Sequence, residues 1–321
     1  MYDVVALGEL LIDFASLNSD SVYPIFEAHP GGAPANYLAA LSSFGAECAM
    51  IAKVGEDAFG TMLIDTLNDI GIDTTGIIKA DDVFTTLAFV TFTKERDRIF
   101  SFARKPGADT MLKESEVNAS LLENTKVFHF GTLSLTDEPS RSATFKAIEI
   151  ARKNGALISF DPNYRAMLWK SEDDAVEMIE KGLKAADIVK ISEEEAELVF
   201  GALSEEEKAM RIHDEYGVRL LYITKGKEGC FYSNKRYSGS MGIYDAGATL
   251  DTTGAGDIFG GSAAFAFLKC GKEIEDLVKD DLESIVRFAT VSSGISTTRS
   301  GGISSVPTLP EVMDDLKYFQ G

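Results

Sequence analysis

Short apolar segments rich in β-branched residues alternate with longer amphipathic segments along most of this chain. Six segments have the length and composition of buried strands: Val4–Leu7, Ala49–Val54, Val127–Phe130, Ala156–Phe160, Ile188–Ile191 and Leu220–Thr224. Apolar residues at three- and four-residue spacing predict helices over Thr61–Ile70, Pro139–Asn154, Ser171–Ala186, Glu193–Phe200, Ser204–Tyr216, Gly256–Cys270 and Leu282–Thr298. Strands that alternate with helices form a parallel sheet covered by helices. We therefore expect an α/β fold with a mostly parallel central sheet.

One region departs from this alternation and predicts a β-hairpin. Residues 84–92 and 98–104 are both strand-like, and only a charged turn at residues 93–97 separates them. The hairpin is either an ordinary edge pair or a lid over a cleft, since small sheets and loops commonly sequester reactants. Strand alternation places four side chains of its second strand on one face: Arg98, Phe100, Phe102 and Arg104.

Length and charge restrict the domain organisation and the partners. A chain of 321 residues is one large domain, or one domain with a small appendage. Its 51 acidic and 31 basic residues give a formal net charge of −20, which repels nucleic-acid phosphates and anionic lipids. We therefore expect no nucleic-acid and no membrane partner. A local site of backbone amides and a metal ion can still bind an anionic substrate.

Three features predict a cytoplasmic protein. The N-terminal segment carries early acidic residues and no basic leader, unlike a signal peptide. The most apolar stretch, Gly260–Leu268, is far shorter than the roughly 20 residues that span a bilayer. Cys48, Cys230 and Cys270 are odd in number and far apart, so they match neither a disulfide framework nor a metal-ligand spacing.

The segment Asp251–Gly261 carries the strongest chemical signal. A loop of small residues, Thr-Thr-Gly-Ala-Gly-Asp, runs directly into an apolar helix. The start of a helix has backbone N–H groups without internal partners, and glycines allow a bulky anion to approach them closely. The pattern predicts a cradle for a phosphate or an oxyanion, with Asp257 either a reactive carboxylate or a helix-start acid. Neither the P-loop string nor the dinucleotide pattern Gly-x-Gly-x-x-Gly is present.

The segment Asp251–Phe259 resembles the C-terminal signature of the PfkB, or ribokinase-like, family of carbohydrate kinases. Further resemblances follow in the family's order: Gly8-Glu9 with Asp13, the glycine motif Pro30–Asn36, Asp161–Arg165, Lys190–Glu195 and Thr224–Gly229. The resemblance implies a single domain over residues 1–321 with a ribokinase-like three-layer α/β/α fold. It also implies a small β-sheet lid formed mainly by residues 12–30 and 72–108.

The resemblance also implies a role for individual residues. Asp257 would be the general base, and the amides of Gly254, Ala255 and Gly256 would form the anion hole. The sugar would be bound by Asp13, Gly32, Asn36, Arg98, Phe100, Arg104 and Arg165. ATP would be bound by Lys190, Thr224, Gly226, Gly229, Gly254, Gly256, Ala289 and Ser293.

Two cations are implied in the same way. Glu195 would hold Mg²⁺ through water, which suits an ion that dehydrates reluctantly. Ser192 stands where many members of the family carry Asn, a departure that weakens its claim to the metal shell. A K⁺ site is implied at Asp251, Thr253, Ser296, Arg299, Gly301 and Ser305.

The lid residues and the segment Asp161–Arg165 resemble those of bacterial fructokinases. We therefore expect an ATP-dependent fructokinase that acts as a homodimer through its lid. Kinases for 2-keto-3-deoxygluconate, ribose or aminoimidazole riboside are the alternatives within the family. A non-catalytic sugar sensor on the same scaffold is the alternative of another class, which the presence of Asp257 and of the complete glycine loop disfavours.

Overall fold

The computed structural model describes residues 1–17, 23–92 and 98–319 of the chain. The side chains of residues 92 and 98–100 lie outside this description, as does the charged turn predicted at residues 93–97.

A nine-stranded sheet forms the centre of the described chain, in the order β13-β12-β11-β10-β9-β8-β1-β4-β5. The strands from β11 to β5 in this order are parallel to one another, whereas β12 and β13 pair antiparallel at one edge. All six predicted strands are confirmed as members of this sheet. The bounds are β1 Tyr2–Leu7, β4 Cys48–Gly55, β5 Ile72–Ala80, β8 Thr125–Gly131, β9 Leu157–Asp161, β10 Ile188–Ser192, β11 Leu220–Thr224, β12 Cys230–Ser233 and β13 Ser238–Met241.

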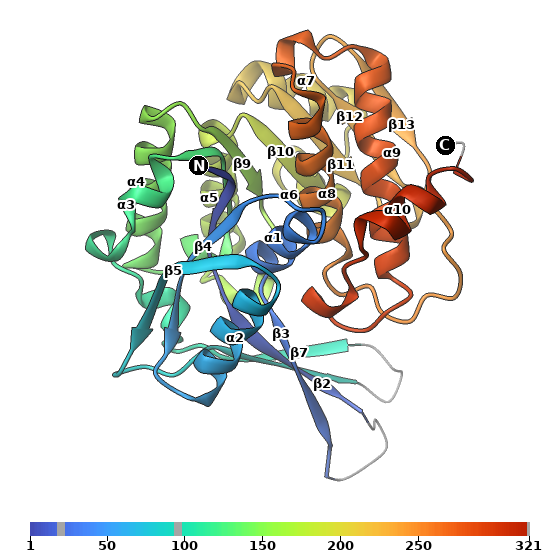
Figure 1. The fold of residues 1–321 in the computed structure, drawn as a ribbon. Coiled ribbons are helices and arrows are strands. Elements are labelled where there is room, and N and C mark those ends of the chain that lie inside the picture. The colour runs from blue at the N-terminus through green and yellow to red at the C-terminus, as the bar shows by residue number, and fades with distance from the viewer. Residues whose placement is uncertain (18–22, 93–97, 320–321) are drawn as a thin grey trace.

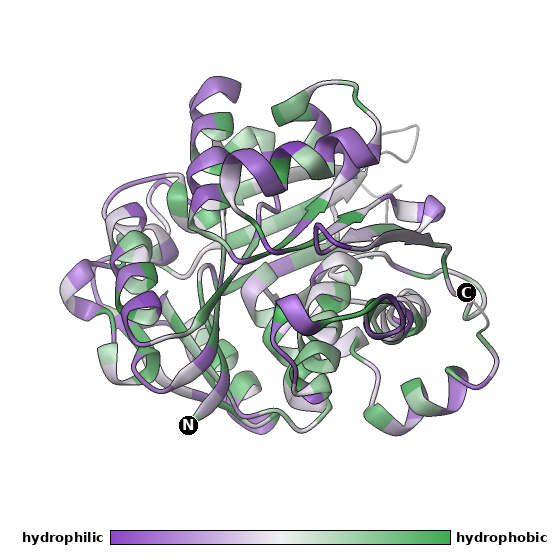
Figure 2. Ribbon diagram, turned by 90° about the horizontal axis from the view of Figure 1, so that it is seen from above, coloured by the Kyte–Doolittle hydropathy of each residue, from purple (hydrophilic) through white to green (hydrophobic). Residues whose placement is uncertain are grey.

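Helices cover both faces of this sheet because its strands are apolar on both faces. Along β1, Val5 and Leu7 belong to one hydrophobic cluster, and Val4 and Ala6 belong to another. Helices α4 to α7 contribute to the first cluster, whereas α1, α2, α8, α9 and α10 contribute to the second. Figure 2 shows the hydrophobic strands between the two layers of helices. The bounds are α1 Ala33–Ser43, α2 Ala58–Asp69, α3 Ala119–Leu122, α4 Ser140–Lys153, α5 Glu172–Ala185, α6 Glu193–Phe200, α7 Glu205–Tyr216, α8 Ala255–Cys270, α9 Lys279–Ser296 and α10 Leu309–Asp315.

A second sheet of four strands projects from one end of the body (Figure 1). Its order is β3 (Phe26–Gly31), β2 (Leu11–Ser16), β6 (Leu87–Phe92) and β7 (Arg98–Ala103). The predicted hairpin is thus β6 and β7, paired antiparallel, and it belongs to a separate four-stranded sheet, here called the lid sheet, rather than to the edge of the main sheet. The expected lid range was too wide, because residues 72–80 form β5 and pair with β4 in the main sheet.

An aromatic cluster packs the lid against the body. The ring of Phe14 on β2 stacks on Phe89 of β6 at a centroid distance of 5.2 Å. The edge of Phe14 also meets Phe59 of α2 at 5.5 Å. Aromatic pairs of this kind contribute stability beyond the area they bury. The lid is therefore attached through one side of β2, next to the residue Asp13.

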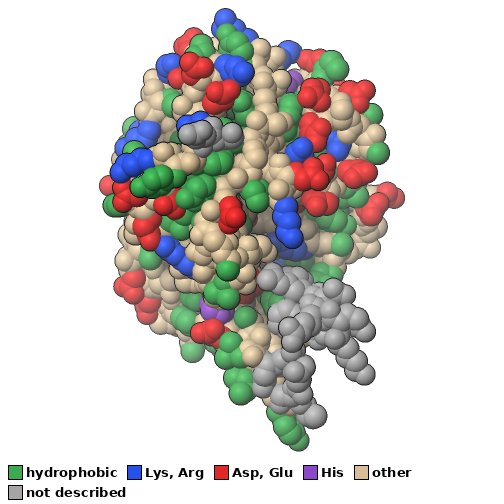
Figure 3. Space-filling view, turned by 90° about the vertical axis from the view of Figure 1, so that its right-hand side faces the viewer, with side chains coloured by type: hydrophobic (Ala, Val, Ile, Leu, Met, Phe, Trp, Pro, Cys, Tyr) green, Lys and Arg blue, Asp and Glu red, His purple; other side chains and the backbone are tan. Residues whose placement is uncertain are grey.

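Charged side chains cover much of the surface. Figure 3 shows Asp and Glu side chains scattered over one face, interspersed with Lys and Arg. In the described residues, no helix combines the length and the apolar character that crossing a membrane requires.

Candidate active site

A cavity of about 210 Å³ lies where the lid meets the start of α8. Several lining residues follow the carboxyl ends of β1, β8 and β9, which is where α/β sheets bind their ligands. Its lining includes the predicted residues Asp13, Gly32, Asn36, Arg165, Gly254 and Asp257, together with Glu9, Leu11, Ala33, Phe102, Leu133, Asn163, Thr252 and Thr253. The structure therefore brings together residues that are up to 248 positions apart in the chain, Glu9 and Asp257.

The start of α8 carries backbone donors that are open to ligands. Gly254 precedes the helix with φ 74, a left-handed conformation that favours glycine. The N–H groups of Gly254 and Gly256 meet no protein acceptor in the described part of the chain. The N–H of Ala255, by contrast, donates to the Thr252 carbonyl at 3.3 Å. Two of the three predicted anion-hole amides are thus open, and the third lies in a long turn hydrogen bond.

Asp257 lies in the first turn of α8 with a side chain held by two amides. Asn36 donates to its Oδ2 at 2.9 Å, and Asn163 donates to its Oδ1 at 2.8 Å. Burial raises the pKa of Asp257, and this rise is opposed by the Asn36 hydrogen bond and by the Lys190 charge. A buried carboxylate with a raised pKa and a fixed orientation is suited to accept a proton.

Asn163 is a site residue that the sequence analysis did not select. It follows β9 in the segment Asp161–Arg165 and has φ 46, in the left-handed region. Such a conformation costs energy for any residue except glycine, and Asn tolerates it best among the others. The signal was present, because an Asn next to Pro and Tyr directly after a strand indicates a special backbone position.

The sugar-binding candidates Asp13 and Asn36 lie in different environments. Burial raises the pKa of Asp13 to about 6, against the opposing charges of Arg165 and His29. Asn36 is 4% exposed, and its Oδ1 has no hydrogen-bond partner among the residues that the structure describes. A buried acceptor without a partner is costly unless a ligand supplies a donor. Both residues are therefore suited to bind a polyol.

Glu9 is a second buried acid that the sequence analysis left without a role. Its Oε1 accepts a hydrogen bond from the Ala33 N–H at 2.8 Å, so it ties β1 to the start of α1. Burial raises the pKa of Glu9 to about 7. Gly32, with φ 120, brings the backbone so close to the Glu9 carbonyl that a side chain would collide with it.

The predicted arginines of the sugar site are placed differently from one another. Arg165 lines the cavity and is exposed. Arg104 is outside its lining, because its guanidinium donates to Asp109 at 2.7 Å, to Thr136 at 2.9 Å and to the Leu133 carbonyl at 2.7 Å. The side chains of Arg98 and Phe100 lie outside the described part of the structure. Phe102, on the same predicted face, does line the cavity.

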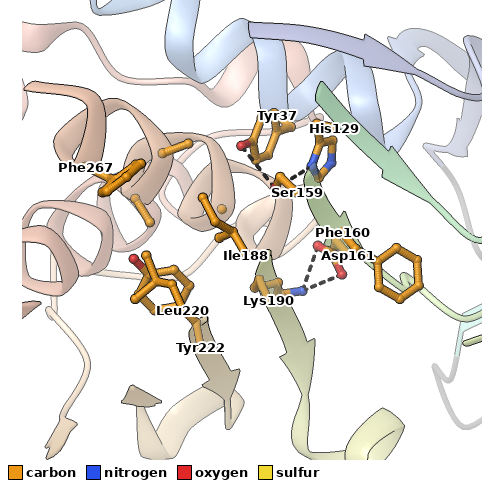
Figure 4. A pocket seen from close by; sticks show the side chains of 13 residues that line it. Tyr37, His129, Ser159, Phe160, Asp161, Ile188, Lys190, Leu220, Tyr222 and Phe267 are labelled. Atoms are coloured by element: carbon orange, nitrogen blue, oxygen red, sulfur yellow. Dashed lines mark hydrogen bonds and ion pairs between the residues drawn. The ribbon is translucent and has the colours of Figure 1, made fainter. Parts of the chain in front are cut away.

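A buried ion pair lies directly beneath the start of α8. The Lys190 ammonium on β10 is 3.1 Å from Asp161 Oδ2 on β9, as Figure 4 shows. A methyl group placed on Gly256 would lie 3.1 Å from this ammonium. Burial alone would lower the pKa of Lys190, but the carboxylates of Asp161, Glu195 and Asp257 together raise it. The ammonium therefore adds positive charge behind the open amides.

A neutral histidine network continues behind this pair. His129 stacks on Tyr37 with ring centroids 3.7 Å apart, and its Nδ1 lies 3.0 Å from the Ser159 hydroxyl (Figure 4). Burial, together with the Lys190 charge, lowers the pKa of His129 to about 3. This histidine is therefore uncharged at neutral pH and packs α1 against β8.

A second cavity, of about 380 Å³, opens on the other side of the α8 start. Of the predicted nucleotide residues, Thr224, Gly226, Gly229, Gly256 and Ser293 line it. Ser293 also donates to the Ala255 carbonyl at 2.9 Å, which fixes α9 to the cradle. The prediction for Ala289 was wrong, because this residue is fully buried in the core. Thr290, Gly294 and Thr297 line the cavity beside Ser293. Most of the loop at residues 243–249, which the sequence analysis passed over, lines it as well.

Glu195, the predicted magnesium residue, is buried, and its carboxylate already accepts hydrogen bonds from the protein. Glu195 accepts hydrogen bonds from the N–H groups of Tyr164 at 2.6 Å and Ser192 at 2.8 Å, one on each carboxylate oxygen. Ser192 accepts in return from the Glu195 N–H, so this pair forms a capping box at the start of α6. No cluster of three His, Cys, Asp or Glu side chains suited to a metal occurs among the described residues. This donor set fits a water-mediated contact better than direct coordination.

Three of the six predicted K⁺ residues, Asp251, Thr253 and Gly301, meet at one loop junction. Asp251 accepts from the Thr253 N–H and hydroxyl through Oδ1 and from the Gly301 N–H through Oδ2, at 2.8–3.0 Å. Arg299, in contrast, pairs with Glu311 and donates to the Val306 carbonyl. The Ser296 hydroxyl donates to the Ser293 carbonyl, and the Ser305 hydroxyl donates to the Gly302 carbonyl. The junction joins the loop before α8 to the loop after α9.

Comparison with known families gives this geometry its context. Residues 1–309 match the pfkB family of carbohydrate kinases. The chain belongs to this family. As a PfkB carbohydrate kinase, it is a phosphotransferase with an alcohol group as acceptor.

Individual relatives cover almost the whole kinase. A protein named probable fructokinase-3 from Arabidopsis thaliana is 39% identical over 98% of this chain and 91% of its own length. Fructokinase-2 from Solanum lycopersicum is 38% identical over 98% of this chain and 96% of its own length.

Solved structures show the same ribokinase-like fold. Fructokinase from Xylella fastidiosa with bound ATP superposes with a TM-score of 0.90 at 27% identity, covering 99% of each chain. Fructokinase from Vibrio cholerae, with fructose, ADP and calcium ion bound, superposes with a TM-score of 0.87 at 27% identity, covering 98% of this chain and 99% of its own.

Proposed function

We propose that this PfkB kinase is a fructokinase, which converts D-fructose and ATP to D-fructose 6-phosphate and ADP. The observation that carries the proposal is the Asp257 carboxylate, held by two amides at a helix start that borders both cavities. The names of the full-length relatives support fructose as the acceptor. The sugar would occupy the 210 Å³ cavity, and ATP would occupy the 380 Å³ cavity.

In the proposed reaction, Asp257 takes the proton of the C6 hydroxyl as its oxygen attacks the γ-phosphorus. The O–P bond to fructose forms, the bond between the γ-phosphorus and the bridging oxygen breaks, and its electron pair remains on ADP. The open N–H groups of Gly254 and Gly256, with the Lys190 charge behind them, stabilise the charge on the transferred phosphoryl group. Donors of this kind contribute about 10²–10³ in rate each.

Two cations complete the proposal. Mg²⁺, bound with ATP, would neutralise charge on the phosphates, and Glu195 would hold its water shell. K⁺ would be held at the junction of Asp251, Thr253 and Gly301, beside the cradle.

The sugar cavity favours a neutral polyol. Asp13 and Glu9 are acidic acceptors, and Asn36 Oδ1 is an acceptor without a partner among the described residues. Arg104 of the lid is already bonded to Asp109, whereas the cation Arg165 does line the cavity. The two acids and the amide oxygen favour fructose, an uncharged acceptor, over 2-keto-3-deoxygluconate.

An ADP-release assay across fructose, ribose, 2-keto-3-deoxygluconate and nucleosides tests the proposal. We expect the largest kcat/KM for fructose. The Asp257→Asn variant should keep sugar and nucleotide binding, measured by calorimetry, and lose about 10³-fold or more in kcat, as a missing base predicts. A wild-type chain that binds sugar but releases no ADP with any acceptor would instead favour the sugar sensor.

We further propose a homodimer that forms through the lid sheets, in a cytoplasmic enzyme. The large apolar side chains Leu17 and Ile25, 62% and 59% exposed at the ends of the lid strands, support the dimer. Free cysteines at Cys48, Cys230 and Cys270 support a reducing compartment. Sedimentation of the wild type beside a Leu17→Asp/Ile25→Asp variant tests the dimer, and the variant should sediment as a monomer.

A further inference from the structure

A third cavity, of about 630 Å³, lies behind the sugar cavity at the base of the lid. Phe102 lines both, and it is the one residue of the described chain that the two linings share. The remaining lining comes from four segments: residues 101 and 104–106, residues 110–111, Asp137 with Glu138, and residues 167–170. We call this space the outer cavity.

Phe102 lies in the wall that the two cavities share. It lies near the end of β7, paired with Ala88 of β6, and its side chain is half-buried. The wall next to it is fixed, because Arg104 in the outer cavity donates to the carbonyl of Leu133, which lines the sugar cavity. Phe102 is therefore the point at which the cavities of 210 and 630 Å³ meet.

The outer cavity has the composition of a glycan subsite. Met167 and Leu168, with the 9% exposed Trp169, supply an apolar surface that a sugar ring can contact. Lys105, Lys170, Asp137 and Glu138 supply charged hydrogen-bonding groups around it. Its volume is three times that of the sugar cavity, which is ample for a second ring.

We propose that Phe102 sets the length of the acceptor: it closes the sugar cavity behind one ring, and its removal would admit acceptors extended by a second glycosyl unit into the outer cavity. This inference rests on the proposed function, because it assumes that the acceptor occupies the cavity beside Asp257. It goes beyond that function by naming the residue that excludes oligosaccharides and glycosides.

The chain offers a direct reporter of the outer cavity. Trp169 is the single tryptophan of the sequence and lines this space. Its fluorescence therefore reports occupancy without any turnover. The test compares fructose with sucrose, a disaccharide whose fructosyl C6 hydroxyl is free, in the wild type and in Phe102→Ala. Phe102→Leu, which keeps most of the bulk, is the matched control.

We expect sucrose to change the Trp169 fluorescence saturably in Phe102→Ala and not in the wild type or Phe102→Leu. The ratio of kcat/KM for sucrose to that for fructose should rise about tenfold or more in Phe102→Ala alone, the size of effect that a pocket wall produces. In the double variant Phe102→Ala/Met111→Tyr, which refills part of the outer cavity without adding a second tryptophan, the fluorescence response should be abolished.

Two outcomes would overturn the inference. One is a saturable response of wild-type Trp169 to sucrose, which would mean that Phe102 does not close the cavity. The other is a folded Phe102→Ala variant that keeps fructose turnover and shows neither the response nor the shift in preference. Failure of the wild type to phosphorylate fructose would contradict the proposed function instead, and the fluorescence comparison would still report whether Phe102 separates the cavities.

Discussion

Asp257 shares its two carboxylate oxygens between amides that come from distant parts of the chain, Asn36 and Asn163. This arrangement leaves little freedom for the carboxylate to rotate. Both partners are neutral donors, so they fix the direction of the carboxylate without cancelling its charge. An arginine in their place would cancel it. The orientation of the base therefore depends on two residues that do not themselves react.

Replacement of Asn163 tests this positioning role. Asn163→Gly removes the hydrogen bond to Asp257 but suits the backbone, whose φ is 46. We expect kcat to fall about 10- to 100-fold, a part of the 10²–10⁴-fold that a positioned base supplies. KM for ATP should stay unchanged in steady-state assays.

Asn163→Ala is the matched control for backbone strain. It should lose the same activity and also unfold more easily than Asn163→Gly, by about 1–2 kcal/mol in urea titrations, because a Cβ disfavours the left-handed region. Equal stability of the two variants together with unchanged kcat would show that Asn163 has no positioning role.

The protonation of Asp13 predicts the pH dependence of sugar binding. Burial raises its pKa to about 6, so its carboxylate is ionised above this pH and neutral below it. An ionised carboxylate accepts hydrogen bonds from two hydroxyls, whereas a neutral one must donate. KM for fructose should therefore rise as the pH falls through 6, approaching about tenfold per pH unit well below the pKa.

Asp13→Asn separates this effect from other titrating groups, since Glu9 and Asp161 also have pKa values raised to about 7 by burial. The variant should show a higher KM at neutral pH and no inflection near 6. An inflection that persists in Asp13→Asn would assign the titration to another group.

Some of the strands and helices could be predicted from the sequence, and others could not. The six main-sheet strands were predictable because each is a nearly continuous apolar run. Helix α1 was missed because its small apolar residues are buried almost all round and show little periodicity. Strands β2 and β3 lie in the lid range 12–30 that the resemblance implied, but no pattern marked their bounds, because Asp13 and the Pro30-Gly31 pair interrupt any simple alternation.

The residues of the candidate site also divide into those that the sequence could identify and those that it could not. Motif resemblance selected Asp13, Asn36 and Asp257, which the fold brings to one cavity. Arg104 was assigned to the sugar because strand alternation placed it beside Phe102, but a partner five residues later, Asp109, holds it. Side-chain partners of this kind depend on the path of the loop after β7, which a strand pattern does not contain.

The Arg104–Asp109 pair predicts how the lid is anchored. The two side chains are 7% and 5% exposed, so removal of one partner leaves a buried charge. Arg104→Met should lower the free energy of unfolding by about 3–5 kcal/mol. Arg104→Met/Asp109→Leu should recover most of this loss in urea unfolding, since a buried pair can be replaced by apolar residues of similar volume.

The same double variant decides between the two interpretations of Arg104. If Arg104 only anchors the lid, KM for fructose in the double variant stays close to that of the wild type. A large rise in KM in a double variant of restored stability would return Arg104 to the sugar site.

For the molecule as a whole, the negative net charge opposes the binding of ATP but not the binding of fructose. The net charge of −20 creates a field that repels ATP, although the cradle attracts its phosphates locally. Fructose is neutral and does not respond to this field. Because the Debye length shrinks from about 30 Å at 0.01 M to about 8 Å at 0.15 M, added salt screens the distant acids more than the nearby cradle.

We therefore expect kcat/KM for ATP to rise about two- to fivefold between 0.01 M and 0.15 M salt, while kcat/KM for fructose changes little. The salt should be tetramethylammonium chloride, since a monovalent metal ion would also fill the proposed site at Asp251 and Gly301. Repeating the series in potassium chloride separates the two effects, because occupancy of that site would raise kcat as well. A decrease of kcat/KM for ATP in tetramethylammonium chloride would mean that the local positive charge of Lys190 and the α8 amides governs the encounter, in spite of the acidic surface.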